Sequence, residues 1–309
     1  MERAYRYTDD IIYAVLAGLP IFLYLPLGIL AHKRIGGGYS DPARNGFNWF
    51  KAALWLAFAH FVTFVIYIIV RFTVWNWTIS IHLSGVAGLF VAFSNYILLL
   101  SIAYLAVGAD RIDNQHDSKR TISCIFVNIV RGILGVSAIL TLVFFIFFRY
   151  YDSKRYADPY SFSGSSASEA DFRAGFVFMW LGLVVDVLQV VVAIYTTVFT
   201  CLARNQARKH AASAGTGLPV MRRVWDFLIP AASITIVTTV WNVVYSVVGG
   251  FGSLRIVDAI ISRWVVLAVF IIIYVIGTKK ETGLWSIPPT ESVEPKNAER
   301  RDEEGHYSV

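Results

Sequence analysis

The stretch LGLVVDVLQVVVAIY, residues 181–195, decides the fold class of this chain. Almost all of it is apolar, and it does not alternate between apolar and polar residues as the strands of a membrane β-barrel do. Because a helix is the other structure that satisfies every backbone group inside lipid, the stretch predicts a membrane-spanning helix. One acid, Asp186, stands inside it, with Gln189 three residues on. A carboxylate in lipid is costly unless it is paired or solvated, so its partner is the first question about function.

The chain as a whole carries the same signal. Of its 309 residues, 56% are hydrophobic and 16% are charged, and its mean hydropathy is +0.58, whereas a soluble domain is about a quarter charged. Seven apolar runs reach the length of roughly 20 residues that a membrane helix needs; they lie at about 11–32, 48–71, 80–107, 122–148, 175–203, 224–248 and 255–277. The sequence therefore predicts an all-α integral membrane protein, with one seven-transmembrane-helix bundle over residues 1–278 and a disordered tail over 279–309.

The distribution of Lys and Arg predicts the orientation of this bundle. These residues gather in the loops after the first, third and fifth runs and in the C-terminal tail. By the positive-inside rule that side is cytosolic, which puts the N-terminus outside and the C-terminus inside. The first run ends in HKR (residues 32–34) rather than in a small-residue cleavage site, so we expect it to be retained. The net charge of +6 then reflects topology; we expect contact with membrane lipids and no nucleic-acid partner.

Four ionisable or amide side chains inside the apolar runs are predicted to share one layer of the bundle. From the helical rise, Asp186 and His60 lie about 16 Å below the outer helix ends, Arg263 about 12 Å and Asn242 about 9 Å. Arg263 is the best-matched partner of Asp186, and His60 is the second. Gln189 is predicted to hydrogen-bond between helices. Three interpretations of Asp186 stay open: an ion pair that fixes helix register, a ligand or ion site, and a catalytic carboxylate.

Some local features predict modification and packing. Asn76, in the sequon NWT, is the one candidate for N-glycosylation, and Cys201 is a candidate for palmitoylation or simply a small buried residue. No disulfide is expected, because both cysteines fall at cytosolic helix ends. Trp225 is expected at the inner membrane interface. Small residues in GVAGLF, residues 85–90, predict a close helix approach.

The topology resembles that of the G-protein-coupled receptors, with seven helices, an outside N-terminus and a cytosolic C-terminus. The third run ends in LSIAYLAVGADRID, where Asp110-Arg111-Ile112 stands at the place of the receptors' Asp-Arg-Tyr. The resemblance implies that Arg111 is a cytosolic switch residue and Asp110 its partner; the alternative is a solvated charge run. The chain departs from rhodopsin-like receptors at Tyr274, which has no Asn-Pro before it, and in lacking a cysteine at the outer end of the third run.

Other seven-helix classes fit less well. The seventh run has no lysine for a retinal Schiff base, and only His60 and His82, on different runs, are histidines within spans. We therefore expect no cofactor and no metal. In size and topology the chain resembles seven-span proteins of filamentous fungi, some receptor-like and others similar to the lipid-translocating exporter family, although the glutamate-bearing pattern associated with those exporters is missing.

These observations favour a receptor-like or sensor protein of the plasma membrane or an endomembrane, rather than an enzyme. We expect a small apolar ligand in the outer half of the bundle, between the runs 80–107, 175–203, 224–248 and 255–277. The basic inner loops would then meet a cytosolic signalling partner or anionic lipid. The alternatives are an exporter of a lipid or secondary metabolite, gated by Asp186 and Arg263, and a membrane enzyme such as a cyclase with Asp186 as its acid.

Overall fold

The helices of the computed structural model confirm the predicted seven spans. The structure describes residues 11–35, 45–73, 77–113, 120–157, 169–213, 221–248 and 252–278, and all regular structure in these ranges is helical. The spans run over Ile11–Arg34, Asn45–Arg71, Ile79–Asp113, Ile122–Phe147, Trp180–Ser213, Arg222–Val248 and Leu254–Thr278. Asn76 and the predicted tail, 279–309, lie outside the described residues.

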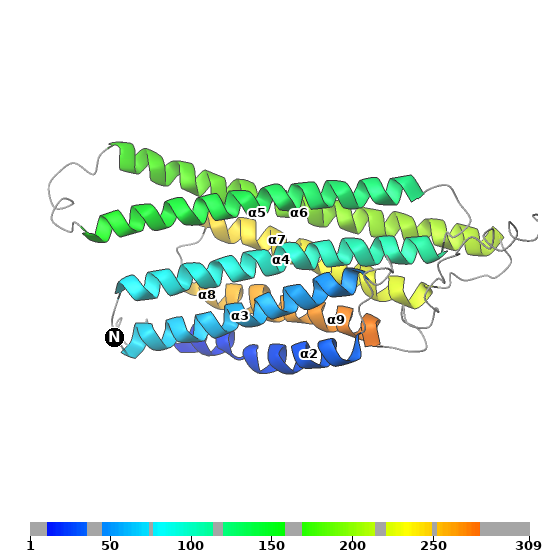
Figure 1. Cartoon of the computed structure of the whole chain (residues 1–309), viewed down its shortest axis with the longest axis horizontal. Coiled ribbons are helices and arrows are strands. Elements are labelled where there is room, and N and C mark those ends of the chain that lie inside the picture. The colour runs from blue at the N-terminus through cyan, green and yellow to red at the C-terminus, as the bar shows by residue number, and fades with distance from the viewer. Residues whose placement is uncertain are drawn as a thin grey trace, which may run out of the picture.

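Successive spans run in opposite directions along one bundle (Figure 1). The elements are α2 (Ile21–Arg34), α3 (Asn45–Thr73), α4 (Trp77–Asp113), α5 (Arg120–Ala157), α6 (Glu169–Ser213), α7 (Arg222–Val248), α8 (Gly252–Ala259), a π-helical segment η1 (Ile260–Val265) and α9 (Val266–Thr278). We call the end where α3 finishes and α4 starts the N-terminal end. The opposite end, where α2, α4, α6 and α9 finish, we call the basic end. Its orientation toward the cytosol stays a prediction.

Several helices are longer than their apolar runs. The largest extension is in α6, which has 45 residues where the predicted run was 175–203. At 1.5 Å per residue it is about 68 Å long, more than twice the hydrocarbon thickness of a membrane. Its last turns read ARNQARKHAAS, residues 203–213, and Ala, Arg, Gln and Lys are strong helix formers. A hydropathy window ends where polarity begins, so it cannot detect such an extension.

Two spans are interrupted. Residues 11–18 are helical, a turn follows, and Pro20 stands at the N-cap of α2, as expected of a residue without a backbone N–H. The last span contains the π-helical segment Ile260–Val265 between α8 and α9. Short π-helical segments inside α-helices occur often at functional sites. Pro230 is accommodated within α7 without ending it.

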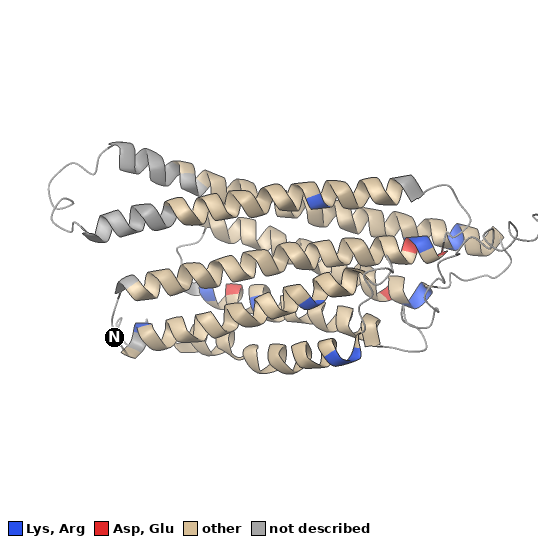
Figure 2. Ribbon diagram, in the orientation of Figure 1, with Lys and Arg blue, Asp and Glu red and all other residues tan. Residues whose placement is uncertain are grey.

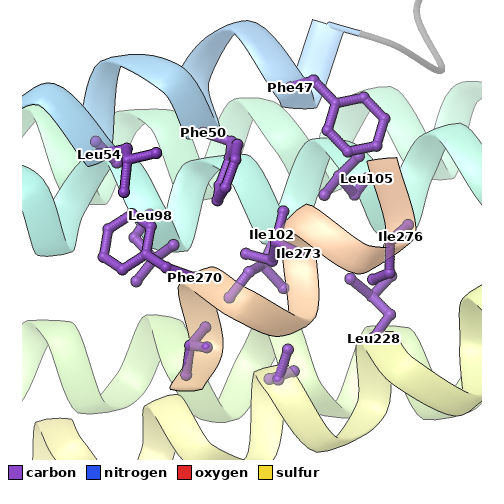
Figure 3. Close-up of a cluster of buried hydrophobic side chains, with 14 of the residues drawn as sticks. Phe47, Phe50, Leu54, Leu98, Ile102, Leu105, Leu228, Phe270, Ile273 and Ile276 are labelled. Carbon is purple, nitrogen blue, oxygen red and sulfur yellow. The ribbon is translucent and has the colours of Figure 1, made fainter. Parts of the chain in front are cut away.

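The tightest packing lies in the basic half of the bundle, where α3, α4, α7 and α9 meet (Figure 3). Its central side chains are Phe47, Phe50 and Leu54 of α3, Leu98, Ile102 and Leu105 of α4, Phe270, Ile273 and Ile276 of α9, and Leu228 of α7. A Cβ on Gly46 would lie 2.7 Å from Leu105 Cγ, and one on Gly277 would lie 2.6 Å from Ile35 Cδ1. At Gly46 and Gly277 the neighbouring segments therefore pack so closely that a side chain larger than hydrogen would overlap with them.

The small residues of GVAGLF, residues 85–90, have different surroundings from one another. A Cβ on Gly88 would have nothing within 4 Å. Gly88 therefore faces open space, whereas the close approach predicted for this stretch is found at Ala87, which is 2% exposed and whose carbonyl oxygen lies 2.7 Å from His60 Nδ1 of α3. Trp225 lies in the first turn of α7 and its side chain is 0% exposed, so it packs inside the bundle and does not face lipid; its position at the membrane interface stays a prediction.

The outside of the bundle is strongly apolar, with large exposed side chains such as Phe22 (73% exposed) and Val247 (67% exposed). A surface of this kind is an aggregation hazard in water and the expected surface in lipid. The described charges lie mostly toward the helix ends, with few along the middle of the bundle (Figure 2). The chain is therefore a multi-pass integral membrane protein with seven apolar helices.

Candidate functional site

Two cavities flank α4 in the N-terminal half of the bundle. The first has a volume of about 550 Å³ and is bounded by α4, α5, α6 and α7; we call it the apolar cavity. The second has a volume of about 290 Å³, is bounded by residues 11–18, α3, α4, α7, α8 and η1, and is called the cationic cavity. Ser84 and Gly88 line both. The small side chains on this part of α4 thus form a wall between two spaces.

The apolar cavity contains two of the predicted polar residues. Its wall is mainly apolar, formed by Ile81, Leu89, Ala92, Phe144, Phe145 and Val185 among others. Asp186 and Gln189 line it from one face of α6, because residues three apart on a helix point the same way. Gln189 is only 4% exposed, and its Oε1 is buried without a hydrogen-bond partner in the described part of the chain.

Asp186 meets a hydroxyl group. Ser246 Oγ of α7 donates a hydrogen bond to Asp186 Oδ2 at 2.5 Å. Across the cavity, the hydroxyl groups of Tyr96 and Thr141 are 2.6 Å apart and joined by a hydrogen bond. The cavity therefore combines apolar walls with a carboxylate, an amide and four hydroxyl groups, the fourth from Ser84.

The predicted ion pair between Asp186 and Arg263 is not formed in this structure. Arg263 lines the cationic cavity and makes no ion pair with any described residue. The helical rise estimates depth along a helix but not the direction in which a side chain points around it. Asp186 and Arg263 line cavities on opposite sides of α4, and their depth in a membrane stays a prediction.

His60, predicted as the second partner of Asp186, also belongs to the cationic cavity. Its ring lines that cavity and is 2% exposed, and its Nδ1 lies 2.7 Å from the carbonyl oxygen of Ala87. Asn242 is half-buried, lines neither cavity and has no hydrogen bond to a described residue. The four polar residues predicted to share one layer are thus divided, with His60 and Arg263 in one space and Asp186 in the other.

The cationic cavity contains residues that the sequence did not single out. Arg71 of α3 and Arg255 of α8 line it beside Arg263, together with Tyr13, Tyr67 and Tyr245. Arg71 Nη1 donates to Tyr67 Oη at 2.7 Å. Arg71 and Arg255 lie at helix ends, where a basic residue is ordinarily solvated, so no local sequence pattern marks them as lining residues.

At the basic end, the two residues matched to the receptor motif bond to α5 and not to each other. Ser123 Oγ donates to Asp110 Oδ2 at 2.8 Å, and Arg111 Nη2 donates to Cys124 Sγ at 3.1 Å. The pairing implied by the resemblance is therefore not present in this structure. A switch role for Arg111 stays a prediction.

The neighbouring acid, Asp113, makes the stronger connection. It accepts hydrogen bonds from Met221 N at 3.1 Å and from Trp225 Nε1 at 2.7 Å, which joins the end of α4 to the start of α7. This contact also explains why Trp225 is buried. Both cysteines are free thiols, as expected, with Cys124 exposed and Cys201 half-buried. Palmitoylation of Cys201 stays a prediction.

Searches against protein-family models, curated proteins and solved structures find no match to this chain.

Proposed function

We propose that this multi-pass membrane protein is a receptor or sensor that binds a small, mostly apolar ligand in the apolar cavity. The observation that carries the proposal is the cavity itself, with about 550 Å³ lined by residues of four helices and walls that are mainly apolar. Small-molecule sites commonly have volumes of roughly 300–1,000 Å³, apolar walls and a small number of polar groups that orient the ligand.

The polar groups of this cavity define the ligand further. Gln189 Oε1 is a buried acceptor without a partner among the described residues, and Asp186 Oδ1 accepts no hydrogen bond from them. A buried acceptor that is left unpaired costs free energy, which a ligand with a donor group recovers. The proposed ligand is therefore an apolar molecule with a hydroxyl or amino group that donates to Gln189 or Asp186.

The connection of the cavity to the basic end supports a sensor. Both α6 and α7 line the cavity, and α6 continues without a break from it to Ser213. Arg208, Lys209, Arg222 and Arg223 are exposed at that end. We propose that these residues meet a cytosolic signalling partner or anionic lipid, and that a change in the packing of α6 against α7 transmits ligand binding to them. Neutralising these four residues should weaken partner binding while leaving ligand binding intact.

Binding is tested with farnesol, an apolar alcohol, and farnesene, its hydrocarbon counterpart, as ligands of the purified protein in detergent. Farnesol should raise the Tm more than farnesene does, because only farnesol carries a hydroxyl group that can donate a hydrogen bond.

Variants assign this response to the apolar cavity. Gly182→Phe places a large side chain in the cavity from α6, where nothing lies within 4 Å of a Cβ, and should abolish the response to both compounds. Gly135→Phe on the lipid face of α5 is the matched control. Gln189→Leu should weaken farnesol binding by roughly tenfold, the value of one hydrogen bond. Equal responses in all variants would exclude this site.

A second measurement separates a sensor from an exporter and an enzyme. A fluorophore is attached to the exposed Cys124 at the basic end, in a Cys201→Ser background. A sensor should report farnesol through this fluorophore and should not move farnesol across sealed vesicles. Net transport of farnesol across the vesicle membrane would show that the protein is an exporter and not a sensor. Conversion of farnesol to a product by the wild-type protein but not by Asp186→Asn would show that the protein is an enzyme and not a sensor.

A further inference from the structure

Basic side chains form part of the wall of the cationic cavity. Arg71, Arg255 and Arg263 line about 290 Å³, and none of the described lining residues is acidic. Asp258 of α8 lies near this cavity without lining it, and its Oδ1 accepts hydrogen bonds from Trp241 Nε1 at 3.1 Å and Ser262 Oγ at 2.7 Å. Among these three arginines, Arg263 makes no ion pair with a described residue, so the electrostatic case for an anion rests on it.

Arg263 is the cation at the inner part of this cavity. It lies within the π-helical segment, and its Cζ is 6.0 Å from the ring centroids of both Phe61 and Phe64. Its Nε is buried and has no hydrogen-bond partner among the described residues. The two aromatic rings offset part of the cost of burying the guanidinium, but a charge inside a membrane bundle is normally paired. An anionic ligand would supply that partner.

His60 adds a second requirement. The carbonyl oxygen of Ala87 can only accept, so the contact at 2.7 Å means that Nδ1 carries the proton. The other nitrogen of a neutral imidazole, Nε2, is then an acceptor. This Nε2 is buried without a partner in the described part of the chain. A ligand beside Arg263 should therefore offer a hydrogen-bond donor as well as a negative charge.

The placement of the arginines suggests a route into the cavity. Arg71 is in the last turn of α3, at the N-terminal end of the bundle, and Arg255 is near the start of α8. His60 is 11 residues before Arg71 on α3, which corresponds to about 16 Å along the helix. Positive charge thus extends from the helix ends inward, and Tyr13, Phe64 and Tyr67 form aromatic walls along the way.

We infer that the cationic cavity is a binding site for a small hydroxycarboxylate with an aromatic or aliphatic body. The carboxylate pairs with the planar guanidinium of Arg263, whose fork of donors matches it geometrically. The hydroxyl donates to Nε2 of His60, and the body packs on the aromatic walls. A singly charged group fits better than a doubly charged phosphate, because one cation faces it at depth and further charge would stay desolvated.

This site is separate from the proposed sensor site. It lies on the other side of the α4 wall, it has a different electrostatic character, and it takes a charged ligand where the apolar cavity takes a neutral one. The two sites can therefore be tested independently, since filling the apolar cavity through Gly182→Phe should leave the carboxylate response unchanged.

Melting curves of the full chain in detergent test the inference with three compounds. The expected result is a saturable rise in Tm with 3-hydroxybenzoate, a weaker one with benzoate, and none with the uncharged 3-hydroxybenzamide. Sodium chloride at equal concentration controls for ionic strength. An equal rise with chloride, or with the amide, would overturn the assignment of a carboxylate.

Variants assign the response to the cavity. Arg263→Gln should abolish it, and Arg263→Lys, which retains the charge without the fork, should weaken half-saturation by roughly tenfold. His60→Phe should remove the advantage of 3-hydroxybenzoate over benzoate. The matched control is Arg131→Gln, which removes an exposed arginine of α5 that lines neither cavity. A response that survives Arg263→Gln, or that is lost equally in Arg131→Gln, would overturn the site.

Photolabelling of the wild-type protein decides the location without any variant. Photoactivated 4-azidosalicylate should insert into α3 between residues 60 and 71 or into the segment 255–263, whose cavity-lining residues belong to the cationic cavity and not to the apolar cavity. Unlabelled 3-hydroxybenzoate should compete with this insertion. Insertion confined to Phe144 and Phe145 of α5 would move the carboxylate to the apolar cavity and overturn the inference.

Discussion

In the basic half of the bundle, α3, α4 and α9 approach until Gly46 and Gly277 leave no space for a Cβ, whereas in the N-terminal half α4 stands between cavities of about 550 and 290 Å³. Residues of α3, α4 and α7 contribute to both halves. The difference lies in the side chains of α4, which are Leu98, Ile102 and Leu105 in one half and include Ser84 and Gly88 in the other. One helix thus supplies both a packed core and the wall between two candidate ligand sites.

This comparison separates stability from binding. Buried aromatic and aliphatic side chains in van der Waals contact stabilise the fold, and a substitution there creates either a cavity or an overlap. Where small residues leave space, a larger side chain is tolerated by the fold but competes with a ligand. The expected effects of substitutions therefore differ in kind between the halves.

The largest loss of stability is expected from Gly46→Val in the basic half of the bundle. A Cβ at this position would lie 2.7 Å from Leu105 Cγ and 3.0 Å from Leu105 N, and the backbone cannot move away as a flexible side chain can. Overpacking of this kind should lower the free energy of unfolding by about 3 kcal/mol. Gly88→Val, in the N-terminal half of the bundle, is the control and should change the free energy of unfolding by less than about 1 kcal/mol. Similar losses in unfolding measurements of both variants would contradict the comparison.

A smaller loss is expected when the link between α4 and α7 is cut. Asp113→Ala removes the acceptor of Met221 N and Trp225 Nε1 and leaves both donors unpaired, which should cost about 2 kcal/mol. Adding Trp225→Phe, which removes one of these donors, should then cost less than it does in the wild type. If the two substitutions are simply additive in thermal unfolding, the hydrogen bond between them does not contribute to stability.

The smallest effects concern the division between the two cavities. In double-mutant cycles, Asp186→Asn and Ser246→Ala should couple by about 1 kcal/mol, because they share a hydrogen bond. Asp186→Asn and Arg263→Gln have no shared partner and should be additive within about 0.5 kcal/mol. Partial rescue in the second cycle would show that Asp186 and Arg263 meet after all and would remove the distinction between the two cavities.

The fold class could be predicted from the sequence because it depends on local properties. Runs such as residues 181–195 are apolar over the length of a membrane, and lipid permits only structures that satisfy their own backbone. Seven such runs determine seven helices, and the turn at Pro20 follows from the covalent structure of proline. The ends of the helices were less predictable, since the polar last turns of α6 remain helical through intrinsic propensity rather than hydropathy.

The sequence by itself determined the class of protein and its seven apolar helices, because apolar length is a property of one helix at a time. Only the tertiary structure decided which of the buried polar residues meet. Asp186 contacts Ser246, and Arg263 shares a cavity with His60, because of the rotation of each helix about its own axis and its distance from its neighbours. Those quantities depend on how all the helices pack together, as at Gly46 and Gly277.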